Sequence, residues 1–237
     1  MNEYTLMLYY RKYLKEIRKV SESTVKHYEG ALKYISRYMI QRHKLQETIY
    51  EIQDIEKLET IREFLYNDPD FVEMDRRNHQ MYSAGFNNYF NFANGIGFSN
   101  ICQEIFKMDM EVPAPMQQNK RSEIWKRSSI IKIQTIEAAG YKCEINSEHT
   151  TFTAKSTGHP YMEGHHVVPL KFQNKFSKNL DIYANVVCLC PVCHRLLHYG
   201  VEREKQIAVD KIYYERADRL AASGIRMDKN DLKKMIC

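Results

Sequence analysis

The chain has 237 residues, of which 43% are hydrophobic, and its formal net charge is +5. This length allows one or two domains with a packed core, and no apolar run approaches the ~18 residues that would span a membrane. The N-terminal segment alternates charged with apolar residues and lacks the apolar stretch of a signal peptide. We therefore expect a soluble, cytoplasmic protein with no membrane partner.

The charge is distributed unevenly along the chain. Residues 1–50 carry a net +5, residues 51–110 a net −6, and residues 111–237 a net +6. Basic segments on both sides of an acidic one permit a polyanionic partner such as nucleic acid. The pattern is weak by itself, because many soluble proteins share a pI near 8.7.

The first hundred residues predict a helical bundle without strands. Apolar residues recur at helical spacing in four segments, which are 3–19, 21–40, 54–67 and 76–94. Ser21 or Ser23 is the expected N-cap of the second helix. The motif DPD at 68–70 is expected to end the third helix.

A proline-containing segment then separates the bundle from the rest of the chain. Residues 111–121, EVPAPMQQNKR, are the best candidate for a linker. Residues 122–140 read as one helix, with Ser122 as its cap and Gly140 as its end. We expect a helical domain over 1–110 and a second domain over 122–237.

After Gly140 the hydrophobic period changes. Residues 151–155 and 160–168 flank the turn signal STGH and predict a β-hairpin. Residues 185–190, NVVCLC, predict a further extended segment. Residues 191–200 begin with proline and end with glycine, which is typical of a short helix. The remaining tail predicts two helices with a break near Ser223–Gly224.

Cysteine and histidine gather in the second domain. Four of six cysteines and six of nine histidines fall between residues 143 and 198. In a cytosolic chain this favours metal ligands over disulfides. The pair Cys190-x2-Cys193 can hold one zinc ion from a tight turn, and Cys143 can supply a third sulfur.

The fourth zinc ligand is less certain from the residues alone. Asn146 stands where a second CxxC would be completed, and His149 is the nearest alternative. Cys188 could substitute, although we expect it to be a core residue, and free buried thiols remain the competing interpretation. A closed site would be structural, and its expected ligands are Cys143, His149, Cys190 and Cys193.

Two further pairs of histidines stand out. His165 and His166 are adjacent in EGHHVVPL, so their side chains leave the backbone in different directions. His194 and His198 are four residues apart on the predicted short helix and project from one face. Two pairs close together favour a second metal site. His159 lies in the predicted turn and is expected to face solvent.

These motifs resemble the HNH endonuclease family. EGHHVVPL followed by ANVVCLCPVCHRLLHYG carries the resemblance, which covers about 141–200 directly and extends over 122–237 as a domain. It implies an α+β fold, in which a zinc-stapled ββα-metal nuclease domain with flanking helices follows the helical bundle. The chain departs from zinc-stapled members at Asn146, where they usually have cysteine.

The resemblance also implies roles for individual residues. His165 corresponds to a metal ligand, His194 to a second and His198 to a third. His166 corresponds to the general base, and Asn185 to the residue that holds this base through its ring or the nearby backbone.

The implied reaction is hydrolysis of DNA phosphodiesters, leaving 5′-phosphate and 3′-hydroxyl ends. His166 would take a proton from water, and His165 would help to hold a divalent ion at the leaving oxygen. Mg²⁺ or Mn²⁺ is expected, while nitrogen ligands also admit Ni²⁺, Co²⁺ or Zn²⁺. The expected enzyme is a bacterial restriction-type nuclease that reads a sequence or a modified base. Alternatives are a mobile-element or phage nuclease and a non-catalytic zinc module, which would need neither His166 nor Asn185.

The helical domain has two candidate roles. Lys12, Lys15 and Lys19 could contact the phosphates of double-stranded DNA, or they could belong to a solvated helix face. Because residues 51–110 are acidic, the domain could instead mediate a homodimer.

Overall fold

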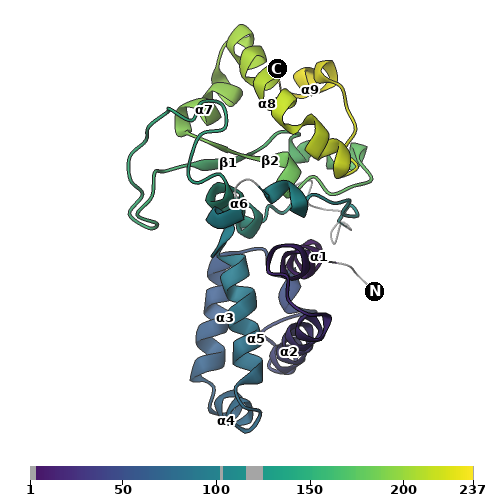
Figure 1. The fold of residues 1–237 in the computed structure, drawn as a ribbon, viewed down its shortest axis with the longest axis vertical. Coiled ribbons are helices and arrows are strands. Elements are labelled where there is room, and N and C mark those ends of the chain that lie inside the picture. Colours follow the sequence, from purple (N-terminus) through teal and green to yellow (C-terminus); the bar gives the residue numbers. More distant parts are fainter. Residues whose placement is uncertain (1–3, 102–103, 116–124, 237) are drawn as a thin grey trace. The chain divides into compact units, whose positions relative to one another are not determined.

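The computed structural model describes residues 4–101, 104–115 and 125–236 (Figure 1). The chain divides into two compact units, unit 1 (Met1–Ile96) and unit 2 (Gly97–Cys237). This division falls earlier than the boundary expected at residue 110. In the described ranges, no helix combines the length and apolar character that crossing a membrane requires.

The expected linker is described only as far as residue 115, and this part belongs to unit 2. Pro113 forms an antiparallel bridge with Lys178, and the N–H of Asn179 donates to the carbonyl of Val112 at 2.8 Å. Val112 is buried. Residues 111–115 therefore pack along unit 2 beside residues 177–179.

The described residues of unit 1 form helices joined by short loops, with no strand, as the periodicity predicts. Its helices are α1 (Thr5–Lys12), α2 (Glu22–Gln41), α3 (Ile55–Asn67), α4 (Pro69–Arg77) and α5 (Met81–Ala93). Helix α1 continues into a π-helical turn, Tyr13–Ile17. Ser21 is the N-cap of α2, and its hydroxyl accepts a hydrogen bond from Thr24.

The helix predicted over 76–94 is observed as α5, which begins only at Met81, and a further helix that was not predicted, α4, precedes it. Asp68 caps α4 by accepting from the N–H of Asp70. Pro69 takes the first helical position, where a missing N–H costs nothing. DPD thus ends α3 and also starts α4. The break before α5 comes at His79 and Gln80, whose φ angles of 54° and 59° are left-handed.

The core of unit 1 is rich in aromatic side chains, and α5 packs there against α1 and α2. The rings of Tyr10 and Tyr89 meet edge to face with centroids 5.1 Å apart. A Cβ at Gly85 would lie 2.5 Å from the Cβ of Ala31, so glycine is what allows this close approach. Tyr10, Phe86, Tyr89 and Phe92 are buried, so aromatic side chains form much of this core.

Unit 2 combines helices with one small sheet. Its described elements are α6 (Ser129–Ala138), β1 (Glu163–His166), β2 (Val186–Leu189), α7 (Pro191–Tyr199), α8 (Glu202–Ala222) and α9 (Lys229–Ile236). Strands β1 and β2 pair antiparallel, with His165 opposite Val187. The predicted α7 and the break between α8 and α9 are both observed.

Two predictions for unit 2 need correction. The expected hairpin between 151–155 and 160–168 is reduced to one bridge, Thr153 with Pro160. Most of the intervening side chains are exposed, whereas β2 is buried along its length, so β1 pairs with β2. Helix α6 begins at residue 129, where the Ser128 hydroxyl accepts from Ile131. The cap predicted at residue 122 lies outside the described residues, while Gly140 ends the segment with a φ of 59°.

Helix α7 follows β2 directly and contacts both strands, and α6 also contacts both strands (Figure 1). A Cβ at Gly164 would lie 2.6 Å from Cγ of Lys132 on α6, so the glycine in EGHH permits this approach. The sequence β1, β2, α7 is the expected ββα arrangement, and the α+β fold class is confirmed. It places the side chains of β1 beside those of α7.

Candidate metal centres and active site

One group of three cysteines and one histidine meets at the start of α7. Cys143 and His149 come from the segment after α6, while Cys190 caps α7 and Cys193 lies in its first turn. Their four ligand atoms all lie within 4.8 Å of one another. His149 Nδ1 is 3.5 Å from Cys190 Sγ and 3.3 Å from Cys193 Sγ.

These distances fit a tetrahedral zinc ion. With bonds of about 2.3 Å to sulfur and about 2.0–2.1 Å to nitrogen, neighbouring sulfur and nitrogen ligands lie about 3.5 Å apart. The two measured separations are close to this edge length. The Cys₃His group could therefore hold zinc, and four protein ligands would leave no open position.

The surroundings of the thiols differ. Burial opposes ionisation of Cys143, but N–H groups of Cys190, Asn146 and Ile145 together hold the pKa of its thiol below the usual value. Burial and neighbouring thiols raise the pKa of Cys193. A bound cation deprotonates such a thiol outright. Cys188 is fully buried in β2 and lies outside this group.

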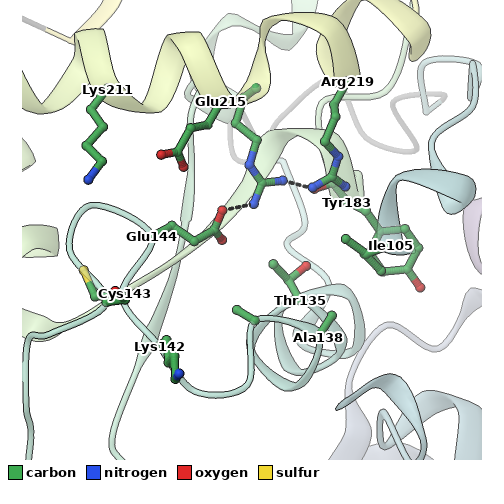
Figure 2. A pocket seen from close by; sticks show the side chains of 13 residues that line it. Ile105, Thr135, Ala138, Lys142, Cys143, Glu144, Tyr183, Lys211, Glu215 and Arg219 are labelled. Carbon is green, nitrogen blue, oxygen red and sulfur yellow. Dashed lines mark hydrogen bonds and ion pairs between the residues drawn. The ribbon is translucent and has the colours of Figure 1, made fainter. Parts of the chain in front are cut away.

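Buried polar contacts anchor the segment that carries Cys143. The N–H of Glu144 donates to the carbonyl of Cys188 at 2.9 Å, and its carboxylate accepts from the N–H of Cys188 at 2.7 Å. The carboxylate also pairs with Arg216 of α8, which donates to the carbonyl of Tyr183 at 3.2 Å. Glu144 and Cys143 border a cavity of about 430 Å³ (Figure 2). These contacts tie the proposed zinc segment to β2 and α8.

Three histidines form a second group. His165 comes from β1, and His194 and His198 come from α7; their ligand atoms lie within 4.8 Å of one another. His165 is only 8% exposed. Burial, together with the neighbouring imidazoles, lowers the pKa of His165 to about 3, and burial likewise lowers the pKa of His198. Both rings are therefore favoured in the neutral form, which is the form that binds metal.

Unsatisfied atoms in this group fit a cation. Within the described part of the chain, His165 Nε2, His194 Nδ1 and Glu163 Oε2 are buried without a hydrogen-bond partner. Glu163 Oε2 and His194 Nδ1 lie 2.5 Å apart, but the geometry of this close contact does not form a hydrogen bond. Buried polar atoms without partners are costly, and a divalent ion would satisfy them. The residues present thus suit a metal ion.

His166 has different neighbours from His165. Its Nε2 lies 2.8 Å from Oδ1 of Asp181, and it is not part of the three-histidine group. Successive residues of a strand point to opposite faces. The adjacent histidines consequently face two different sets of groups.

Asn185 is fully buried and binds backbone close to His166. Its Oδ1 accepts from the N–H of Val168 at 2.7 Å, and its Nδ2 donates to the carbonyls of Val168 at 2.9 Å and Leu180 at 2.7 Å. Its own carbonyl accepts from Val167 at 2.8 Å. Asn185 was expected to contact either the ring of His166 or the backbone nearby. The structure contains the contacts to nearby backbone.

Sequence reasoning missed Glu163 and Asp181. Glu163 precedes His165 by two residues, so strand periodicity could have placed both on one face. Asp181 lies in NLDIYANVV, where no spacing marks it. Its position beside His166 depends on the folded chain.

The three candidate lysines for DNA binding lie together in unit 1. Lys12 ends α1, Lys15 is in the π-helical turn, and Lys19 follows it. Lys15 Nζ is 2.8 Å from a carboxylate oxygen of Glu22 in an exposed pair, and such pairs contribute little stability. Lys12 is half-buried, whereas Lys19 is exposed.

The family model for HNH endonucleases matches residues 143–200. These residues are an HNH endonuclease domain. The chain is also 30% identical over 106 residues to the type IV methyl-directed restriction enzyme EcoKMcrA of Escherichia coli (strain K12). That segment covers 45% of this chain and 35% of the relative. The chain therefore matches about a third of the relative's length.

Residues 143–200 include both groups that could hold a metal ion. They also include His166 and Asn185. Two of the contacts that reach this domain from outside residues 143–200 involve neighbours of these side chains. Ser128 at the start of α6 binds Asp181 at 2.7 Å, and Arg216 of α8 binds Glu144. Elements on both sides of the family match thus contact the residues beside His166 and Cys143.

Proposed function

We propose that this protein is a metal-dependent, restriction-type HNH endonuclease that hydrolyses phosphodiester bonds of double-stranded DNA. One arrangement carries the proposal. Unsatisfied ligand atoms converge around His165, while the next residue, His166, is held separately by Asp181. Phosphodiester hydrolysis needs a base for the attacking water and a stabilised leaving oxygen on the far side of phosphorus. Adjacent histidines with separate neighbours can serve both sides.

The three-histidine group would hold the catalytic ion. His165, His194 and His198 would be its ligands, with Glu163 beside them. When bound, a divalent ion supplies positive charge that stabilises the leaving oxygen and a phosphate oxygen. Mg²⁺ or Mn²⁺ is the expected ion, and the nitrogen ligands also suit Ni²⁺, Co²⁺ or Zn²⁺.

His166 would act as the general base and take a proton from water. Asn185 would keep this base in place through the backbone, because its side chain bonds both polar groups of Val168. The group of Cys143, His149, Cys190 and Cys193 would bind a structural zinc ion, since four protein ligands exclude substrate.

The similarity to a methyl-directed restriction enzyme supports a proposal for the substrate class. We infer that modified DNA is the preferred substrate. One active site cuts one strand, so cleavage of both strands would use two copies of the chain. Lys12, Lys15 and Lys19 would add affinity through phosphate contacts.

His166→Ala tests the proposal. The purified protein is incubated with unmodified and cytosine-methylated plasmids in Mg²⁺ or Mn²⁺, and the cut ends are sequenced. We expect the variant to lose cleavage by about 10²–10⁴-fold, which is the usual contribution of a general base, while still binding DNA. His159→Ala is the matched control, because His159 is exposed in the loop before β1.

Two outcomes would count against the proposal. Cleavage by His166→Ala at the wild-type rate, under equal metal and salt conditions, would remove His166 as the base. Equal cutting of both plasmids by the wild-type protein would contradict the preference for modified DNA.

A further inference from the structure

Asp181 lies between the ring of His166 and the first turn of α6. It is 6% exposed. Its Oδ1 is 2.8 Å from His166 Nε2, and its Oδ2 accepts from the N–H of Ser128 at 2.7 Å. Its own N–H donates to Asn179 Oδ1 at 2.9 Å. Each carboxylate oxygen therefore faces one defined partner.

The two partners determine where the protons lie. A backbone N–H can only donate, so Ser128 requires an acceptor at Oδ2. An ionised carboxylate only accepts, so the nitrogen facing Oδ1 must carry the hydrogen. In the neutral ring of His166 the hydrogen is then on Nε2, and the lone pair is on Nδ1. This tautomer leaves Nδ1 able to take a proton.

We infer that Asp181 is a positioning residue, which selects the Nε2–H tautomer of His166 and fixes the direction of its ring. The inference rests on the proposed role of His166 as the general base. Ser128 holds the carboxylate in turn, so the start of α6, outside the HNH match, is part of the support for the base. Orientation of a catalytic histidine by a buried carboxylate is a known means of keeping the productive tautomer.

Asp181→Asn tests this logic because an amide has one acceptor atom and one donor group. The N–H of Ser128 needs the amide oxygen, which leaves the NH₂ group facing His166 Nε2. That contact requires a lone pair on Nε2, so the ring proton moves to Nδ1 and blocks the base. We expect kcat to fall by about 10²–10⁴-fold, as for the loss of a general base, with KM for DNA and zinc content close to wild type.

The tautomer can be observed directly by NMR. Protein labelled with ¹⁵N at histidine is measured with zinc bound and no further divalent ion, and His166→Ala identifies the signals of His166. The wild-type ring should be in the Nε2–H form and the Asp181→Asn ring in the Nδ1–H form. Asp181→Glu keeps two acceptor oxygens, so it should keep the Nε2–H form and recover part of the lost kcat.

Asp75→Asn is the matched control. Asp75 is also 6% exposed, and its carboxylate accepts from the N–H groups of Tyr82 and Ser83 in unit 1. This variant should keep both the wild-type kcat and the wild-type tautomer of His166.

Several results would overturn the inference. These are wild-type His166 in the Nδ1–H form, Asp181→Asn in the Nε2–H form, and wild-type kcat in Asp181→Asn. The wild-type spectrum decides the matter even if Asp181→Asn fails to fold. If His166→Ala cleaves normally, the proposed function fails; if it is inactive while Asp181→Asn is fully active, only the role of Asp181 fails.

Discussion

Replacing Asn185 with alanine should destabilise unit 2 by about 3 kcal/mol. The side chain is fully buried and makes three hydrogen bonds, two to Val168 and one to Leu180. At about 1 kcal/mol net for each hydrogen bond, the loss sums to about 3 kcal/mol. Alanine offers no replacement donor or acceptor. The backbone groups of Val168 and Leu180 that lose their hydrogen bonds are buried away from water. Because the lost contacts hold the segment after His166, cleavage should fall together with stability.

The single tryptophan of the chain gives a local assay. Trp125 lies in unit 2, so its fluorescence during urea titration, in buffer containing zinc, reports unfolding there. Gln206→Ala is the control, because it removes one exposed hydrogen bond to Glu202 on α8 and should change stability by no more than about 0.5 kcal/mol. If the free energy of unfolding of Asn185→Ala is within about 1 kcal/mol of wild type, the three hydrogen bonds of Asn185 do not contribute the expected stability.

Two further predictions concern metal and DNA. Cys190→Ser/Cys193→Ser should lose about one tightly bound zinc ion per chain in elemental analysis, while Cys188→Ala should keep it; unchanged zinc in the double variant would rule out the structural site. Changing Lys12, Lys15 and Lys19 to glutamate should weaken binding to duplex DNA and flatten its salt dependence, because fewer counterions are released. Fluorescence anisotropy across a salt series measures this binding. If the slope of affinity against salt concentration is unchanged, unit 1 has another role, and dimerisation is the first to test.

Local chemistry made much of the candidate site predictable. Pro191 and Gly200 bracket α7, so the helix and the common face of His194 and His198 follow from the sequence. The CxxC spacing is equally local, since Cys190 and Cys193 share one turn. Strand alternation separates His165 from His166 wherever the strand lies. These features depend on neighbours within a few residues, and short-range geometry is set by the backbone itself.

Other features depend on which distant segments become buried together. The sequence predicted a hairpin for β1, but burial of β2 gave β1 a different partner. Asp181 meets His166 across 15 residues and Ser128 across 53, while Glu144 meets Arg216 across 72. No spacing rule links positions so far apart, because their contact is made only when α6, β2 and α8 assemble around one core. The sequence by itself therefore predicted the ligand types and placed His165 and His166 on opposite faces, whereas tertiary packing decided which carboxylates lie beside the histidines.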